Sequence, residues 1–179
     1  PRECEVTIMM TDLRGFTQYA EKLKPVEVLS FLNNLQGNLS SIVEQQGGWV
    51  DKFMGDGILA VFGAPRPLDN HAEQALKASQ AILQGAKYWS PLAIGVGLHS
   101  GLIMSGCLGT GGHLEFTVIG DTVNVASRLE ELTKQVGHPI LVSIKTQRQI
   151  ASSTLVSLGE VSIRGRDEQL EVFTLAEGD

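Results

Sequence analysis

Short apolar runs alternate with segments of helical period along the whole chain. Residues 5–11 are mostly apolar and predict a buried strand that ends at Asp12. A helix is predicted to begin near Pro25, because proline is favoured in the first helical turn, and to end at Gly47-Gly48. Its apolar face is predicted to consist of residues three or four positions apart: Val28, Leu32, Leu35, Leu39 and Ile42.

The rest of the chain predicts further strands and helices that interleave. Gly55-Asp56-Gly57 joins two apolar segments, 49–54 and 58–63, and is a strong signal for a tight hairpin. A helix is expected over 69–87, and another that Asp121 or Thr122 caps and that reaches about Gln135. The remaining predicted elements are strands at 92–99, 102–108, 114–119 and 139–143, a short helix at 144–151, and a hairpin of 155–163 with 170–175. This order predicts one α/β or α+β domain over 1–179, with a sheet covered by helices on one face.

Composition and charge narrow the class of protein. The chain has 179 residues, of which 42% are hydrophobic and 19% charged, and a mean hydropathy of +0.06, as in a folded domain. A net charge of −6 argues against nucleic-acid binding, although a metal-bound nucleotide remains compatible with it. Cys4 and Cys107 fit neither a disulfide framework nor a zinc site and suit a reducing cytosol.

Nothing in the sequence predicts contact of this domain with a membrane. No apolar run approaches the roughly 20 residues of a membrane span, and no signal-peptide pattern opens the chain. The chain begins at Pro1 and reaches its first strand almost at once. We therefore expect a cytoplasmic module taken from a longer protein.

Two carboxylates, Asp12 and Asp56, lie where a predicted strand gives way to a turn that contains glycine. Taken singly, Asp12 could cap a helix and Asp56 could be an ordinary turn residue. Together, two carboxylates at adjacent strand ends can hold Mg²⁺, which binds proteins through one or two carboxylates plus substrate phosphates. If the two turns meet in space, they predict phosphate chemistry on a nucleotide.

Two further segments carry polar residues that suit such a site. Leu13, Arg14, Gly15, Phe16 and Thr17 offer successive backbone N–H groups that lead into a helix, a natural cradle for phosphate oxygens. Asn124 and Arg128 lie four residues apart on one predicted helix and point the same way. Such a pair is most often a solvated helix face, but the apolar neighbours of Asn124 predict that it is mostly buried in a polar site.

Three stretches resemble the signature segments of class III nucleotidyl cyclase catalytic domains, most closely the lysine/threonine adenylyl cyclases of bacteria. These are residues 11–17 (TDLRGFT), 52–56 (KFMGD) and 117–128 (TVIGDTVNVASR), in family order and at family-like spacing. The resemblance implies a ferredoxin-like palm, a mixed sheet within an α+β fold. It also implies a head-to-tail homodimer with two equivalent active sites at the interface.

The resemblance assigns roles residue by residue. Asp12 and Asp56 of one partner would bind two Mg²⁺ ions, for which Mn²⁺ can substitute, with the Leu13 carbonyl as a further ligand. From the other partner, Asn124 would orient the ribose and Arg128 would stabilise charge in the transition state. Lys52 and Thr117, also of that other partner, would recognise the base. A basic residue near the last hairpin would bind phosphates, and Arg166 is favoured over Arg164. The loop 109–114 lacks the Arg or Lys that many relatives carry there.

Hydrogen-bond polarity predicts the base. Lysine only donates and a threonine hydroxyl can accept, so Lys52 with Thr117 complements N1 and the exocyclic amine of adenine. Guanine-specific relatives typically carry an acidic residue in place of Lys52. The expected activity is conversion of ATP to 3′,5′-cyclic AMP and pyrophosphate. The alternatives are a guanylyl cyclase, a diguanylate cyclase, whose Gly-Gly-Asp/Glu-Glu-Phe hairpin this sequence does not reproduce, and a catalytically silent dimerisation module.

Overall fold

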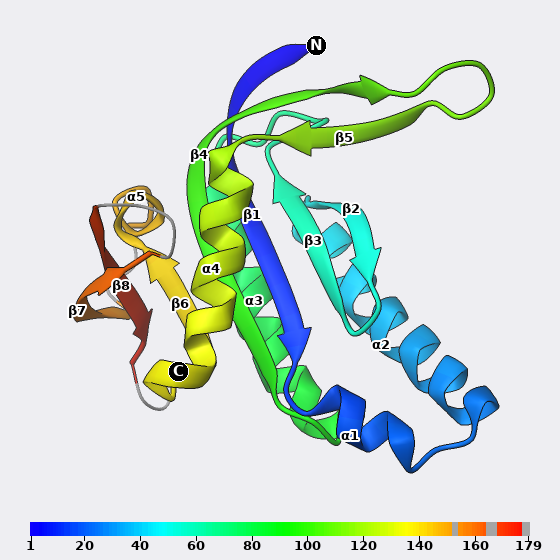
Figure 1. Ribbon diagram of the computed structural model, residues 1–179. Helices are drawn as coiled ribbons and strands as arrows, with labels where there is room; N and C mark the ends of the chain where they lie inside the picture. Colours follow the sequence, from blue (N-terminus) through cyan, green and yellow to red (C-terminus); the bar gives the residue numbers. More distant parts are fainter. Residues whose placement is uncertain (152–153, 164–167, 177–179) are drawn as a thin grey trace.

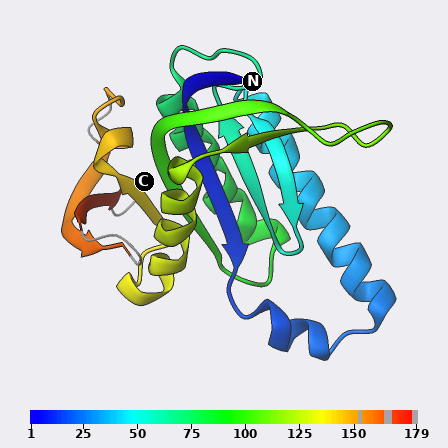
Figure 2. The same cartoon turned by 45° about the horizontal axis from the view of Figure 1, so that its top comes forward.

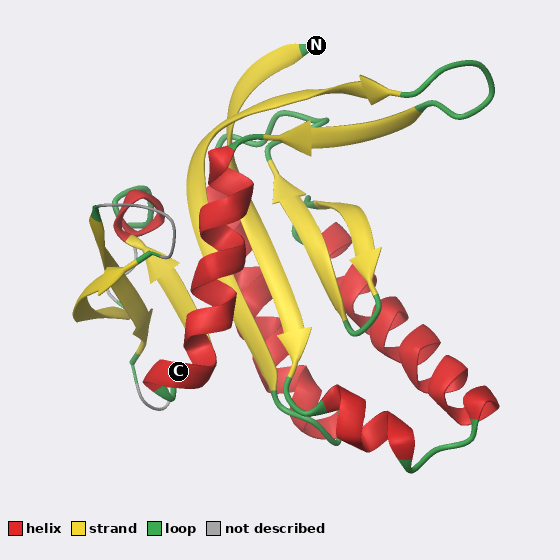
Figure 3. Ribbon diagram, viewed as in Figure 1, coloured by secondary structure: helices red, strands yellow, loops and turns green. Residues whose placement is uncertain are grey.

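The protein is built around one mixed sheet. The computed structural model describes residues 1–151, 154–163 and 168–176. The strand order is β2-β3-β1-β4-β6-β8-β7, with β5 paired to β4 (Figure 1, Figure 3). All pairs are antiparallel except β4 with β6. The strands are β1 (Arg2–Leu13), β2 (Trp49–Met54), β3 (Gly57–Phe62), β4 (Ile94–Leu108), β5 (Glu115–Ile119), β6 (Ile140–Ser143), β7 (Leu155–Ser162) and β8 (Gln169–Leu175).

Helices cover both faces of the sheet, which corrects the expectation that they lie on one face. Helices α2 (Pro25–Gln45) and α3 (His71–Trp89) pack against one face, and α4 (Asp121–Val136) packs against the other (Figure 1). Glycines of β4 make room for α4: a β-carbon at Gly97 would lie 2.5 Å from the Ala126 carbonyl oxygen, and one at Gly101 would lie 2.6 Å from Thr122 Oγ1. The mixed α+β class itself is confirmed.

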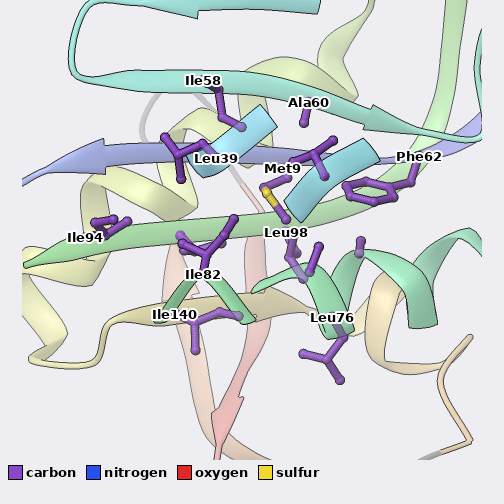
Figure 4. Packing of buried hydrophobic residues seen from close by; sticks show 14 of the residues in the cluster. Met9, Leu39, Ile58, Ala60, Phe62, Leu76, Ile82, Ile94, Leu98 and Ile140 are labelled. Atoms are coloured by element: carbon purple, nitrogen blue, oxygen red, sulfur yellow. The ribbon is translucent and has the colours of Figure 1, made fainter. Parts of the chain in front are cut away.

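Successive side chains of a strand point to opposite faces of the sheet, and this explains why the core has two sides. Met9, Ile58 and Leu98 point toward α2 and α3, where they pack with Leu39 and Ile82 (Figure 4). The alternate strand residues form a second cluster on the face that carries α4: Val6, Ile8, Met10, Leu59 and Val61. Because successive strand side chains point to opposite faces, continuously apolar strands such as β3 indicate cover on both sides.

Several predicted elements differ from the observed ones at their ends. The two strands expected at 92–99 and 102–108 form one long strand, β4, because Ser100-Gly101 continues the ladder with β1 without a turn. The far end of β4 pairs with β5 to make an arm that reaches over β2 and β3 (Figure 2). Gly120, rather than Asp121 or Thr122, occupies the N-cap of α4, since Thr122 Oγ1 donates to the Leu102 carbonyl at 2.7 Å.

The helix expected after Leu13 is present as α1 (Phe16–Glu21), which begins three residues after β1 ends. Helix α5 (Ile144–Gln147) is shorter than expected. The buried side chains of α2, Leu35, Leu39 and Val43, all lie in its second half, whereas Val26 and Leu29 in the first half are largely exposed.

Candidate active site

The two carboxylates meet at one end of the sheet. Asp12 is the penultimate residue of β1, and Asp56 lies in the turn between β2 and β3. Gly57 permits the approach, because a β-carbon there would overlap the Thr11 carbonyl oxygen. Ile58 N donates to Thr11 Oγ1 at 3.1 Å and holds the hairpin against β1. The side chains of Asp12 and Asp56 lie close enough for each to influence the ionisation of the other. The expected juxtaposition of the two turns is therefore present.

The two neighbouring carboxylates of Asp12 and Asp56 suit a bound cation. Burial, and then the hydrogen bond and negative charge of Asp56, raise the pKa of Asp12 to about 7. The charge of Lys134 and the Leu13 N–H, 2.9 Å from Asp12 Oδ1, act in the opposite direction. At neutral pH the pair therefore holds a proton for much of the time, and a divalent cation would replace that proton. Among the described residues no group of three or more His, Cys, Asp or Glu side chains forms a complete metal cage.

The segment from Leu13 to Thr17 offers fewer free N–H groups than the sequence predicted. Leu13 N donates to Asp12, and Arg14 N donates to the Ala93 carbonyl at 2.9 Å. Gly15, with φ of 73°, is the N-cap of α1, and no side chain caps that helix. The free N–H groups are therefore those of the first turn of α1, where Phe16 stacks on Phe31 and Thr17 is exposed.

The expected base-recognising residues contact each other. Lys52 Nζ donates to Thr117 Oγ1 at 2.9 Å, which joins β2 to the arm strand β5. Trp49 and Phe116 reinforce this contact with an edge-to-face pair of rings 5.9 Å apart. Thr117 is buried, whereas the Lys52 side chain is 44% exposed and can reach a ligand.

Asp51 is a residue of this site that the sequence analysis missed. Its carboxylate lies 3.0 Å from Lys52 Nζ, and its side chain is wholly buried. The register of β2 against β3 shifts between Val50 and Lys52, so a β-bulge falls at Asp51. No periodicity reveals such a bulge, although the adjacent Asp51-Lys52 pair in the sequence was a signal that could have been weighed.

Glu130 of α4 is a second residue near the site that could not be selected from the sequence. It is only 6% exposed, and its Oε2 atom has no hydrogen-bond partner among the residues that the structure describes. Burial, and then the charge of Asp12, raise the pKa of Glu130 to about 7. Glu130 and Thr133 face Gly95 of β4, the residue that pairs with Asp12 of β1.

Asn124 and Arg128 lie on the outer side of α4. Asn124 is exposed, which corrects the expectation that it is mostly buried: Val125 and Ala126 fill the inner face of the helix and turn Asn124 toward solvent. Arg128 is half-buried and pairs with Glu131 at 3.5 Å. Residues 128 and 130 project from nearly opposite sides of a helix, so Arg128 points away from the strand that carries Asp12. Arg164 and Arg166 lie outside the described residues.

A hollow in the described part of the chain lies away from these residues. It has a volume of about 490 Å³ and lies where α3, β4, β6 and β8 approach one another, with Leu83, Ile94 and Ile140 in its lining. Neither Asp12 nor Lys52 borders it. The carboxylates and the Lys52–Thr117 pair therefore lie apart from this hollow.

In the described part of the chain, none of the helices combines the length and the apolar character that a membrane span needs.

Comparison with known proteins places this geometry in a family. Residues 1–177 match the adenylate and guanylate cyclase catalytic domain. An adenylate cyclase of Anabaena cylindrica is 34% identical over 185 residues, covering 94% of this chain and 36% of that protein. Adenylate cyclase 1 of Rhizobium meliloti is 32% identical over 179 residues, covering 94% of this chain and 27% of that protein. The chain thus spans about a third of the length of these curated relatives.

Solved structures of cyclase domains have the same fold as this chain. The adenylyl cyclase CyaB from P. aeruginosa superposes with a TM-score of 0.90 at 27% identity, covering 99% of this chain and 96% of that one. The guanylate cyclase domain of RhGC from Catenaria anguillulae, in complex with GTP, has a TM-score of 0.88 at 26% identity and covers 98% of both chains. The matched residues include the β1 end, the β2–β3 hairpin and α4. This chain therefore belongs to the family of class III adenylate and guanylate cyclase catalytic domains.

Proposed function

We propose that this domain is an adenylyl cyclase that converts ATP to 3′,5′-cyclic AMP and pyrophosphate. The observation that carries the proposal is the meeting of Asp12 with Asp56 at one sheet end, combined with the Lys52–Thr117 contact on the adjoining strands. The names of the relatives, which include adenylate cyclases, support the same activity.

The reaction is attack of the ribose 3′-oxygen on the α-phosphorus, which closes a cyclic phosphate and expels pyrophosphate. Asp12 and Asp56, with the Leu13 carbonyl, would hold Mg²⁺ or Mn²⁺, which supplies Lewis-acid activation of the 3′-hydroxyl and neutralises phosphate charge. The protein's own residues position the substrate and stabilise charge. In this proposal Asn124 orients the ribose, Arg128 faces the charge that develops on the phosphate, and Arg166 contacts the terminal phosphates.

The base preference rests on donors and acceptors. The ammonium of Lys52 can donate to adenine N1, and the Thr117 hydroxyl has a lone pair free to accept from the exocyclic amine. Guanine presents an N1–H donor at the first of these positions, so it leaves the Lys52 ammonium opposite another donor. A guanylyl cyclase is the second candidate, since the similar chain from Catenaria anguillulae is a guanylate cyclase domain.

A head-to-tail homodimer completes each site in this proposal. Asn124 and Arg128 turn away from Asp12 within one chain, so a second copy is needed to bring them to the carboxylates. Exposed apolar side chains that could pair two copies gather on β2 and on the β4–β5 arm: Trp49, Phe53, Met54, Leu102, Met104, Leu108, Leu114 and Ile119. A two-fold interface would then create two equivalent sites.

The test is to incubate the domain with ATP or GTP and Mg²⁺ and to identify the products. The proposal predicts cyclic AMP, formed with a higher kcat/KM than cyclic GMP. Faster cyclic GMP formation would assign the domain as a guanylyl cyclase, and a cyclic dinucleotide would assign it as a diguanylate cyclase. A silent module would form no product and would not bind a non-cyclisable ATP analogue in the presence of Mn²⁺.

A further inference from the structure

The buried carboxylate of Asp51 contacts Lys52, one of the two expected base-recognising residues. In a regular strand the side chains of Asp51 and Lys52 would point to opposite faces. The bulge between Val50 and Lys52 removes that alternation, and Asp51 Oδ2 lies 3.0 Å from Lys52 Nζ. The fold therefore uses an irregular residue to bring this carboxylate to the lysine.

The surroundings of Asp51 favour a cationic side chain at position 52. The Asp51 side chain is 0% exposed, and Oδ1 has no hydrogen-bond donor in the described part of the chain. Lys52 is the ion-pair partner that the structure gives this carboxylate. A buried charge that loses its partner is disfavoured, so Asp51 favours a cation at position 52 even when no nucleotide is bound.

The geometry also fixes which hydrogen bonds remain for a ligand. The Lys52 ammonium has three N–H donors: one is directed at Asp51 and one at Thr117 Oγ1, 2.9 Å away. One donor is left, together with one lone pair on the Thr117 oxygen. A donor beside an acceptor matches the N1 and exocyclic amine of adenine.

We propose that Asp51 is a positioning residue that sets the base selectivity of this site, because it holds Lys52 as a charged donor against Thr117. The inference rests on the proposed cyclase function and adds a third residue to its base-recognising pair. The position of Asp51 also affects the recognition of guanine. Replacing Lys52 by glutamate places a new carboxylate beside the buried Asp51, and two like charges in contact disfavour each other. A switch of selectivity to guanine is therefore larger when Asp51 is replaced as well.

The test compares kcat and KM for ATP and GTP among Asp51→Asn, Lys52→Glu and the double variant. In the otherwise unchanged protein, Asp51→Asn lowers the ATP-to-GTP ratio of kcat/KM roughly tenfold, the size expected for two coupled charges in contact. In the Lys52→Glu background the same change raises kcat/KM for GTP by a similar factor. Asp69→Asn changes an exposed acid away from the site and is the matched control. It leaves the ATP-to-GTP ratio of the otherwise unchanged protein, and kcat/KM for GTP of the Lys52→Glu protein, as they are.

An unchanged ATP-to-GTP ratio in Asp51→Asn, or equal GTP turnover with and without Asp51→Asn in the Lys52→Glu protein, overturns the inference. Asp51→Thr, which suits a strand, replaces Asp51→Asn if thermal melting reveals a misfolded variant. Titration with non-cyclisable ATP and GTP analogues measures the same selectivity without catalysis. If the unchanged domain forms no cyclic nucleotide, the proposed function fails, and the binding ratio still tests Asp51.

Discussion

At the scale of single residues, Arg128 offers the sharpest separation between binding and chemistry. In the proposed site its guanidinium meets charge that develops on the phosphate only during reaction. Arg128→Ala should therefore lower kcat by about 10³–10⁵ while KM changes little. Steady-state kinetics with ATP measure both constants, and Arg148→Ala, an exposed arginine away from α4, is the control. A rise in KM with unchanged kcat would mean that Arg128 serves substrate binding instead.

Glu130 and Asp12 give a prediction about pH and stability. Folding raises the pKa of Glu130 from 4.5 to about 7, so the fold favours its protonated form. The resulting stabilisation is complete below the unfolded pKa and is lost as pH rises through the folded one. The free energy of unfolding of the metal-free domain should therefore fall between pH 5 and pH 8 by a contribution that Asp12 shares, since its pKa is raised in the same direction.

Glu130→Gln isolates the share of Glu130 in that loss. Urea unfolding in the presence of a chelator should show a smaller decline from pH 5 to pH 8 in the variant than in the unchanged protein. His71, whose pKa burial lowers, contributes with the opposite sign in both proteins and cancels from the comparison. Identical declines in the two proteins would show that Glu130 is not held in its neutral form by the fold.

Individual residues also mark where sequence reasoning succeeds and fails. Asp12 and Asp56 could be selected because both lie at predicted strand ends, whereas Lys52 and Thr117 were selected only from the resemblance to the cyclase family. The structure brings the members of each pair together, and their roles stay predictions. The burial of Asn124 could not be predicted, because an apolar sequence context does not tell which side of a helix faces the sheet. Asp51 was missed because a β-bulge depends on pairing with another strand.

At the scale of elements, α4 depends on the glycines of β4. A β-carbon at Gly97 would meet the backbone of Ala126 and Glu130 at 2.5–2.6 Å, where no side chain can rotate away. Gly97→Ala should displace α4 and cost about 1–3 kcal/mol of unfolding free energy, which corresponds to a melting temperature lower by roughly 2–4 °C per kcal/mol.

Gly112→Ala is the matched control for Gly97→Ala, because it lies in an exposed loop with nothing within 4 Å of the added methyl. Thermal melting of the two variants measures the difference. Equal melting temperatures would mean that α4 adjusts its position at no cost and that β4 does not fix it.

The type of most elements could be predicted from hydrophobic period, and their ends and neighbours could not. The helix from Pro25 and the hairpin at Gly55-Asp56-Gly57 carry local signals in full: a first-turn proline and a glycine turn. Strand β4 was divided into two because Ser100-Gly101 resembles a turn, whereas Gly101 instead makes room for Thr122 of α4. The second helical layer was missed because the sequence of α4 does not tell which face of the sheet the helix covers.

At the scale of the whole molecule, one chain carries every residue type that the proposed reaction requires, but not within one site. Asp12 and Asp56 lie together, while Asn124 and Arg128 project from the outer side of α4. Exposed apolar side chains on β2 and the β4–β5 arm provide a surface for a second copy. Lys52 and Asp56, only a few residues apart, would then serve different sites of one dimer.

Mixing two inactive variants, Asp56→Asn and Arg128→Ala, tests this arrangement most directly. In a mixed dimer, one shared site carries both defects and the other carries neither. An equal mixture should therefore recover about a quarter of the activity of the unchanged protein, since half of the dimers are mixed and each has one intact site. If the mixture stays inactive although tagged subunits confirm that mixed dimers form, each site is built within one chain and the account is contradicted.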